Sequence, residues 1–535
     1  MKADLIIHNA HAFTADPSQP WAEAAALAGN RILAVGDNQQ IRELEGPGTR
    51  TIDGQGRSLL PGFIDSHFHL LWGSMELADA QLGGVQNLDA LRSSLEIYRS
   101  KYPDRSWIVG QGLPYLQLPG RDPLNRSDLD TMIPNRPAAL SSYDGHTVWA
   151  NTRALELAGI LNGGSAGPGS TIVMGSDGLA SGELRERDAF RKVLDLIPIP
   201  DEAEKRRLLQ SGLHQAAELG ITSIHNMDGD LNQLGRYMAL EDLGELSLRV
   251  YVPYSIRPHT VEKDLEEATE MALANPTGLA RGGAVKFFID GVIESYTALV
   301  LEEYADAPGV LGDSLYSADH FNRMGAEADR LGFQIFTHAI GDAAVRRTLD
   351  GYEEAARRNG RRDSRHRVEH LELIDPNDLP RFAQLGVIAA MQPEHAPLQP
   401  SGQDIWPKRV GPGRWDRSFA WRRVRQAGAI LTFGSDWPVV TQSPFQGIHA
   451  ALNRRPWGPG LLDQRQTLEE TLYSYTSLGA YAEFKEAEKG KLAGGYLADL
   501  VLLSEDIFAT APGRLKEVRP VLTICDGRVV FERDT

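Results

Sequence analysis

Short apolar runs that follow a glycine recur along the central part of the chain. Residues 216–225, 331–338, 385–391 and 427–433 each begin as the end of a helical pattern, pass through a glycine and continue as an apolar run. Glycine is favoured just after a helix ends, and an uninterrupted apolar run is typical of a strand that is covered on both faces. This alternation predicts an α/β fold with a parallel sheet, either an eight-stranded barrel or a doubly wound sheet.

Both ends of the chain predict short strands instead. Apolar runs at 5–7, 32–35 and 58–60 are separated by turn-forming residues, and further runs lie at 500–503, 521–524 and 529–531. The last two are joined through Asp526-Gly527, which is a strong hairpin signal. Because so few strands are rarely stable alone, we expect the two ends to share one sheet.

Residues from about 72 to 200 do not follow the helix–strand alternation. They contain turn-rich stretches at 110–123 and 163–170, which are too long for simple connections. We therefore expect an inserted subdomain or lid in this region.

Composition and charge exclude several classes of protein. The 535 residues include 55 Lys and Arg against 72 Asp and Glu, a net charge of −17 that argues against a nucleic-acid partner. The single cysteine, Cys525, has no partner for an intramolecular disulfide, and no uncharged apolar run approaches the roughly 18 residues of a membrane span. We expect a soluble, cytoplasmic protein without a membrane partner, whose oligomeric state stays open, a homodimer included.

Polar side chains end several of the predicted strands. His67 and His69 are two residues apart in an extended segment, so both imidazoles project to the same side and can reach one ion. Lys286, His338, His370 and Asp436 lie in or at the ends of four further strands. Each has a plainer explanation alone: an exposed strand end, an outward lysine, a hydrogen-bonded histidine or a helix N-cap. Together they occupy the strand ends where parallel barrels place active sites.

This ordered set resembles the amidohydrolase superfamily of metal-dependent hydrolases, in the branch that includes the N-substituted formamide deformylases. The resemblance spans nearly the whole chain, and its segments are PGFIDSHFH at 61–69, VKFFIDG at 285–291, THAIGD at 337–342, VEH at 368–370, GSDWP at 434–438, residues 490–500, and DGH at 144–146. It implies a (β/α)8 TIM barrel at 61–489 with the insertion at about 72–200. It also implies a small β-sandwich domain built from 1–60 and 490–535.

The resemblance further implies a metal site. Its ligands are His67 and His69 after the first barrel strand, Lys286 after the fourth, His338 after the fifth, His370 after the sixth and Asp436 after the eighth. In binuclear members the lysine reacts with carbon dioxide, and the carbamate bridges two cations; an unmodified ammonium has no lone pair to donate. We expect two Zn²⁺ ions bridged by carboxylated Lys286, with a one-metal site as the alternative.

These residue types suit hydrolysis of an amide. A divalent cation lowers the pKa of bound water towards about 7 and polarises a carbonyl. Asp436 can accept the proton of the water and pass it to the departing nitrogen, so it is the expected general base and acid. His338 is the second expected catalytic residue. The predicted function is hydrolysis of a small-molecule amide or N-substituted formamide at its C–N bond. The alternatives are a metal-dependent ester or lactone hydrolase, an isomerase, or a non-catalytic binding protein.

Six residues are candidates for substrate binding. They are Asp144, His146 and Glu183 in the insertion, Trp72 and Trp437 close after metal motifs, and His225 at the end of another strand. Each could equally be a structural residue. His366, His395 and His449 have no matched context and receive no role.

Overall fold

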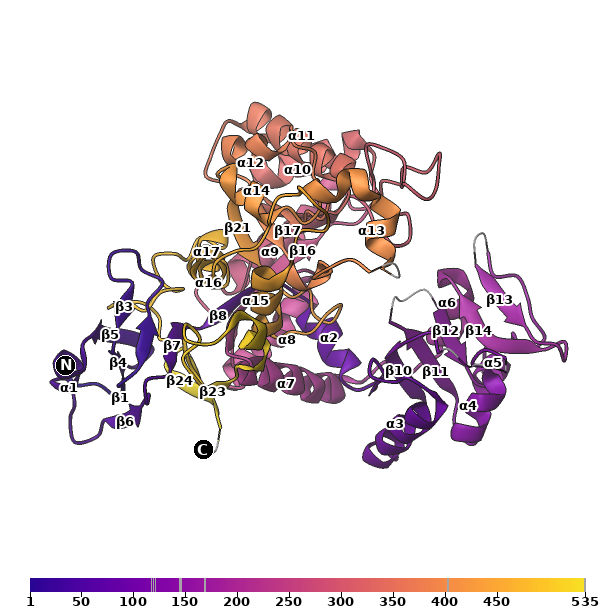
Figure 1. Cartoon of the computed structure of the whole chain (residues 1–535), viewed down its shortest axis with the longest axis horizontal. Helices are drawn as coiled ribbons and strands as arrows, with labels where there is room; N and C mark the ends of the chain where they lie inside the picture. Colours follow the sequence, from indigo (N-terminus) through magenta and orange to yellow (C-terminus); the bar gives the residue numbers. More distant parts are fainter. Residues whose placement is uncertain are drawn as a thin grey trace. The chain divides into compact units, whose positions relative to one another are not determined.

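The computed structural model describes residues 1–116, 118, 120, 122–143, 147–167, 170–401 and 404–533 (Figure 1). The chain forms two units, one built from residues 1–70 and 213–535 and the other from residues 71–212. Within the described residues, no helix is both long enough and apolar enough to cross a membrane.

Eight parallel strands form the centre of the first unit. In sheet order, which is also chain order, they are β8 (Phe63–Phe68), β15 (Ile221–Asn226), β16 (Arg249–Ser255), β17 (Ala280–Phe288), β18 (Gln334–Ala339), β19 (Arg367–His370), β20 (Ile388–Met391) and β21 (Ile430–Phe433). The backbone N–H of Asp436 donates to the carbonyl of His67 at 2.7 Å, and that of His69 donates to the carbonyl of Trp437 at 3.0 Å. The first and last strands therefore meet at their carboxyl ends, and the nearly closed sheet confirms the predicted TIM barrel.

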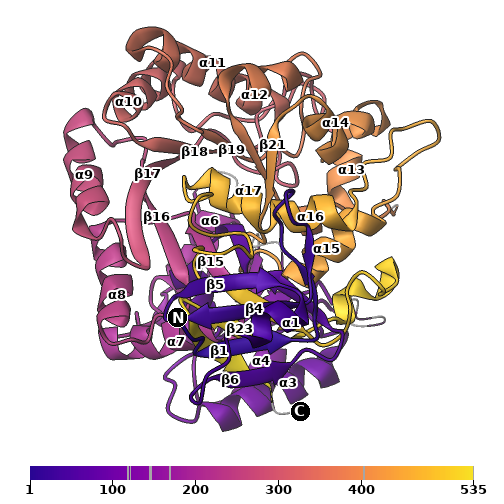
Figure 2. The ribbon, with the colours of Figure 1, turned by 90° about the vertical axis from the view of Figure 1, so that its left-hand side faces the viewer.

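Helices lie on the outside of these strands (Figure 2). They include α8 (Leu231–Asp242), α9 (Leu265–Ala274), α10 (Ala318–Arg330), α11 (Asp342–Asn359), α12 (Leu379–Leu385) and α14 (Trp421–Gln426). Four glycines precede the strands that the sequence pattern predicted, and all are left-handed: φ is 79° at Gly220, 90° at Gly332, 67° at Gly386 and 83° at Gly428. This conformation ends each helix and directs the chain into the next strand, which is why the glycine pattern located β15, β18, β20 and β21.

Further helices belong to the first unit, called the barrel unit below. They are α1 (Asn38–Arg42), α13 (Ile405–Val410), α15 (Pro444–Asn453), α16 (Leu468–Ser474) and α17 (Ser477–Ala482), with 3-10 turns at Glu262–Asp264, Pro393–His395, Pro412–Arg417 and Pro512–Glu517.

The two ends of the chain build two further sheets. One has the order β5 (Arg31–Gly36), β4 (Ala24–Ala28), β1 (Leu5–His8), β6 (Arg50–Asp53), and the other the order β24 (Arg528–Glu532), β23 (Pro520–Cys525), β22 (Leu500–Leu503), β7 (Ser58–Pro61), β2 (His11–Phe13), β3 (Trp21–Ala22). Strand β7 pairs antiparallel with β22, so both ends do share a sheet. Buried residues of both sheets, such as Ile7, Leu27, Leu59 and Leu502, form one core.

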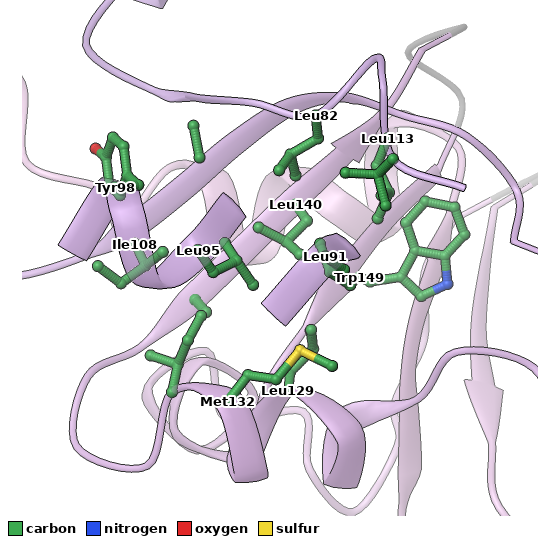
Figure 3. Packing of buried hydrophobic residues seen from close by; sticks show 14 of the residues in the cluster. Leu82, Leu91, Leu95, Tyr98, Ile108, Leu113, Leu129, Met132, Leu140 and Trp149 are labelled. Atoms are coloured by element: carbon green, nitrogen blue, oxygen red, sulfur yellow. The ribbon is translucent and has the colours of Figure 1, made fainter. Parts of the chain in front are cut away.

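The second unit has its own mixed sheet and its own core. The sheet order is β13 (Thr171–Met174), β14 (Ala180–Arg185), β12 (Thr147–Ala150), β11 (Ala138–Ser142), β10 (Ile108–Leu113), β9 (Ala80–Gln81). Its helices are α3 (Leu88–Lys101), α4 (Arg126–Met132), α5 (Thr152–Leu157) and α6 (Arg187–Leu194), while α2 (Leu70–Glu76) and α7 (Glu202–Glu218) connect it to the barrel unit. Leu91 and Leu95 of α3 pack with Leu140 and Trp149 of the sheet (Figure 3). A role as a lid, and the domain limits given above, stay predictions.

Candidate metal centre

The carboxylate of Asp436 lies close to four histidines that come from the ends of three strands, β8, β19 and β20. Oδ1 of Asp436 lies 3.3 Å from Nε2 of His67 and 3.3 Å from Nε2 of His69. Oδ2 lies 3.9 Å from Nδ1 of His370 and 3.7 Å from Nε2 of His395. Two triads of potential ligands therefore share Asp436, namely His67–His69–Asp436 and His370–His395–Asp436. Donor atoms this close together, from imidazole and carboxylate groups, suit a divalent cation such as Zn²⁺.

A buried carboxylate joins the first strand to the loop that carries Asp436. Asp65 accepts hydrogen bonds from the backbone N–H of His67 at 3.0 Å and from that of Ser435 at 3.0 and 3.1 Å. Burial raises the pKa of Asp65 to about 7, against the opposing effect of these hydrogen bonds. Asp436 itself has a φ of 62°, a conformation that is unusual for a residue with a side chain. This set of bonds supports a strained backbone at the position where the carboxylate is needed.

Gly434 leaves room for this arrangement, and its replacement by alanine is expected to disturb the centre. A Cβ there would lie 2.4 Å from the backbone nitrogen of His67 and 2.8 Å from Oδ1 of Asp65. We expect Gly434→Ala to lower the free energy of unfolding by about 1–3 kcal/mol and to reduce the bound metal, because His67 must move. The matched control is Gly235→Ala in α8, where an added Cβ meets nothing within 4 Å. It should stabilise the helix by about 0.5–1 kcal/mol. Chemical denaturation and metal analysis measure both variants; equal stability and metal content in Gly434→Ala would contradict the expectation.

Hydrogen bonds to Nδ1 fix the orientation of three of the histidines, His67, His69 and His370. Nδ1 of His67 lies 2.7 Å from Oε2 of Glu369, Nδ1 of His69 lies 2.8 Å from Oδ1 of Asp228, and Nδ1 of His370 lies 2.9 Å from Oε1 of Gln392. A carboxylate on one ring nitrogen sets the tautomer and strengthens the other nitrogen as a ligand. No role was predicted for these partners from the sequence. Asp228 offered one signal, since it is an acid just beyond the end of β15.

The electrostatics of the centre keep Asp436 ionised and two of the histidines neutral. Burial alone would raise the pKa of Asp436, but the neighbouring His67, His69 and His370 hold it well below its ordinary value. Burial and the charge of Lys286 lower the pKa of His338 to about 3, and burial with the neighbouring histidines lowers that of His370 well below its usual range. Neutral imidazole has a free lone pair, so these side chains are in the form that a cation requires.

Lys286 is fully buried in β17. Its Nζ lies 3.8 Å from Sδ of Met227 and 4.8 Å from the ring centre of Phe288. Within the described part of the chain, no carboxylate forms a salt bridge with it. Burial lowers its pKa to about 8, so an appreciable fraction is the neutral amine that reacts with carbon dioxide. Carboxylation of Lys286 stays a prediction.

The structure places the other predicted site residues in different surroundings. Trp437 is 7% exposed, and its ring packs against Phe68 with 5.0 Å between ring centres. Trp72 and Glu183 belong to the second unit, where Trp72 donates to Glu76 at 2.7 Å and Glu183 accepts from Arg185 at 2.6 Å. Asp144 and His146 lie outside the described residues. Substrate binding by any of these residues stays a prediction.

His225 lies inside the barrel as part of a buried chain of charged groups. Its Nε2 is 3.3 Å from Oε1 of Glu483, and its Nδ1 accepts a hydrogen bond from Arg367 at 2.6 Å. Nε of Arg367 is 2.8 Å from Oε1 of Glu369, whose other oxygen holds His67. Both Arg367 and Glu369 are 0% exposed. In this structure His225 therefore contacts Arg367 and is three interactions away from His67, a candidate metal ligand.

His338 and His395 complete the surroundings of His370. The ring centre of His338 lies 4.4 Å from that of His370, while its Nε2 lies 3.1 Å from the carbonyl oxygen of Gly291. His395 is in the 3-10 turn Pro393–His395 that follows β20, and no role was predicted for it. Its position in sequence, four residues after the seventh strand ends, was the available signal. The conformation of the loop decides whether such a residue lies near Asp436. The pattern of apolar and polar residues in the sequence does not predict that conformation.

A parallel barrel with a buried imidazole and carboxylate donor set at the carboxyl ends of its strands defines a metal-dependent enzyme of the TIM-barrel class. The chain belongs to the amidohydrolase family, whose family model matches residues 50–531. This membership confirms the resemblance found in the sequence and places the chain among hydrolases.

Individual relatives agree with this assignment. The protein LONG AFTER FAR-RED 3 of Arabidopsis thaliana is 31% identical over 519 residues, covering 94% of this chain and 87% of its own length. An N-substituted formamide deformylase of Arthrobacter pascens is 27% identical over 545 residues, covering 99% of this chain and 98% of its own. The crystal structure of an uncharacterized metal-dependent hydrolase from Pyrococcus furiosus is 27% identical, with a TM-score of 0.73 over 93% of this chain and 98% of that chain.

Proposed function

We propose that the protein hydrolyses a C–N bond of a small-molecule amide or N-substituted formamide. The observation that carries the proposal is the carboxylate of Asp436, whose two oxygens both face histidine nitrogens at the carboxyl end of the barrel. The similarity to an N-substituted formamide deformylase over 99% of this chain supports this class of substrate.

Zn²⁺ is the cofactor that we propose for the centre. His67, His69, His338, His370 and Asp436 are the residues that would hold it, and carboxylated Lys286 would allow a second ion; a centre with one ion is the alternative. A bound divalent cation polarises a substrate carbonyl and lowers the pKa of water, which are the two effects that amide hydrolysis needs at neutral pH.

Asp436 has the charge state required of a general base. Its pKa is well below the ordinary value despite burial, because His67, His69 and His370 surround it. It is therefore a carboxylate at neutral pH and can accept a proton from the attacking water. The same group, once protonated, can deliver that proton to the departing nitrogen. His338, neutral because its pKa is about 3, is the second residue to which we assign a catalytic role.

Substrate contacts are proposed for two groups of residues. In the first unit, Trp437 directly follows Asp436 in sequence, and its largely buried ring packs against Phe68. In the second unit, Glu183 lines a cavity of about 570 Å³ together with Tyr115, Thr147 and Trp149. Arg185 and Glu186 line the same cavity. Aromatic walls with a few polar groups are typical of small-molecule sites.

Removal of metal is the direct test of this function. Dialysis against a chelator should abolish hydrolysis of N-substituted formamides and acyl amines, and added Zn²⁺ should restore it, because the histidines and Asp436 act through a cation. The measurement is product analysis on a panel of amides, esters and lactones before and after metal removal. Activity on esters or lactones alone would replace C–N hydrolysis with the alternative hydrolase, and activity that survives full metal removal would refute both.

A further inference from the structure

Two of the predicted ligands share a pattern of hydrogen bonds. In His67 and His69, a carboxylate holds Nδ1, at 2.7 Å from Glu369 and 2.8 Å from Asp228, and Nε2 points to Oδ1 of Asp436. A carboxylate that holds one ring nitrogen while the other faces an ion is the usual environment of a histidine that binds metal.

His395 repeats this pattern on the opposite oxygen of Asp436. Its Nδ1 lies 3.3 Å from Oε1 of Glu372, and its Nε2 lies 3.7 Å from Oδ2 of Asp436. Glu372 is itself fixed, because Nε1 of Trp406 donates to its Oε2 at 2.6 Å. Among the described residues, the buried Nε2 of His395 has no hydrogen-bond partner. A buried polar nitrogen without a partner is costly, and a bound cation would remove that cost.

The neighbouring histidines are oriented differently. His338, the ligand expected from the fifth strand, has its Nε2 at 3.1 Å from the carbonyl of Gly291, and His370 has its Nδ1 at 2.9 Å from Gln392. The rings of His370 and His395 are stacked, with 6.0 Å between centres and 13° between planes. On the Oδ2 side of Asp436, His395 is therefore the histidine whose Nε2 faces the carboxylate.

We propose that His395 is a metal ligand, which binds a divalent cation through Nε2 together with His370 and Asp436, and that Glu372 orients it. This inference deepens the proposed function, on which it rests for the presence of metal. It gives the centre a second ion position whose ligands include a histidine from the turn after the seventh strand, independently of any carbamate on Lys286.

The test measures metal binding directly in the holoenzyme. Zn²⁺ content per chain is determined by elemental mass spectrometry, Zn²⁺ affinity by competition with a chromogenic chelator, and ligand geometry by the visible absorption of the Co²⁺-substituted protein. For His395→Ala we expect the affinity of the more weakly held ion to fall by at least about 10-fold, with a changed Co²⁺ spectrum. The matched control is His366→Asn, because Nε2 of His366 also faces a carboxylate, at 3.2 Å from Oδ1 of Asp329.

A second variant keeps the test valid if His395→Ala does not fold. Glu372→Gln leaves the ring in place but removes the charge that orients it, and should weaken the same ion by about 10–100-fold. Zn²⁺ content, affinity and Co²⁺ spectrum equal to wild type in folded His395→Ala, or in Glu372→Gln, would overturn the inference. Because these are binding measurements, they separate the two claims. If the variants bind Zn²⁺ more weakly but the wild-type protein cleaves no amide, His395 is a ligand and the proposed function is wrong. If the variants bind Zn²⁺ as wild type does and the wild-type protein is an active amidase, the function holds and His395 is not a ligand.

Discussion

Asp436→Asn is expected to abolish hydrolysis and to leave the fold intact. The amide has nearly the same shape as the carboxylate, but it cannot accept a proton from water at neutral pH. It also offers a weaker ligand at the point where His67, His69 and His395 converge. Loss of a general acid–base group typically lowers the rate on the order of 10²–10⁴-fold. Because Asp436→Asn also weakens a ligand, we expect a reduction near the upper end of this range. The measurement is kcat/KM on the best substrate of the amide panel, alongside Zn²⁺ content.

A second buried aspartate controls for simple destabilisation. Asp329 is 4% exposed and its Oδ1 lies 3.2 Å from Nε2 of His366, in an arrangement like that of the centre but on α10. Asp329→Asn should lower stability and keep kcat/KM within a few-fold of wild type, since it lies outside the catalytic group. If Asp436→Asn retained more than about a tenth of wild-type kcat/KM at full metal occupancy, the base would have to be another residue.

The strands of the barrel could be predicted from sequence because their signal is local. Gly386 ends α12 in a left-handed conformation, and the apolar run after it is β20, so one short segment contains both boundaries. Strand β16 was not singled out. It contains Pro253 within its apolar run, and no glycine directly precedes it. Proline disfavours a strand prediction even where, as here, the fold accommodates it.

The convergence of the candidate ligands could be predicted for the same reason. His67, His338 and His370 lie within their strands, and Asp436 follows β21 closely, so parallel strands bring them to one end of the barrel. His395 was missed because its approach to Asp436 depends on a 3-10 turn.

Strand periodicity also does not predict how deep inside the barrel a side chain lies. Alternation indicates which side a residue such as His225 faces, but not which layer of the interior it joins. Its partners, Glu483 and Arg367, come from distant parts of the chain. The buried contacts of His225 indicate a structural role, and its substrate contact stays a prediction. Arg367, which contacts His225, is the residue whose replacement is expected to affect stability most.

Arg367→Met is expected to destabilise the protein by about 3–5 kcal/mol. Arg367 is fully buried, where its guanidinium contacts Glu369 at 2.8 Å, Nδ1 of His225 at 2.6 Å and the carbonyl of Ser66. Methionine replaces the aliphatic part of the arginine side chain and has no charge, so the buried carboxylate of Glu369 would lose its guanidinium partner. Burial would then raise the pKa of Glu369, which Arg367 and His67 now hold at about 2.

The double variant Arg367→Met/Glu369→Leu isolates the charge effect. Removing both charges leaves no buried ion without a partner, so much of the lost stability should return, although His67 loses its support and Zn²⁺ should bind more weakly. An exposed pair provides the control. Arg330 is 59% exposed and 2.6 Å from Glu327, and Arg330→Met should change stability by at most about 1 kcal/mol. Urea unfolding of the metal-free proteins measures the stability of Arg367→Met, of the double variant and of Arg330→Met. A loss in Arg367→Met no larger than in Arg330→Met would mean that the buried chain from Glu483 to His67 does not stabilise the barrel.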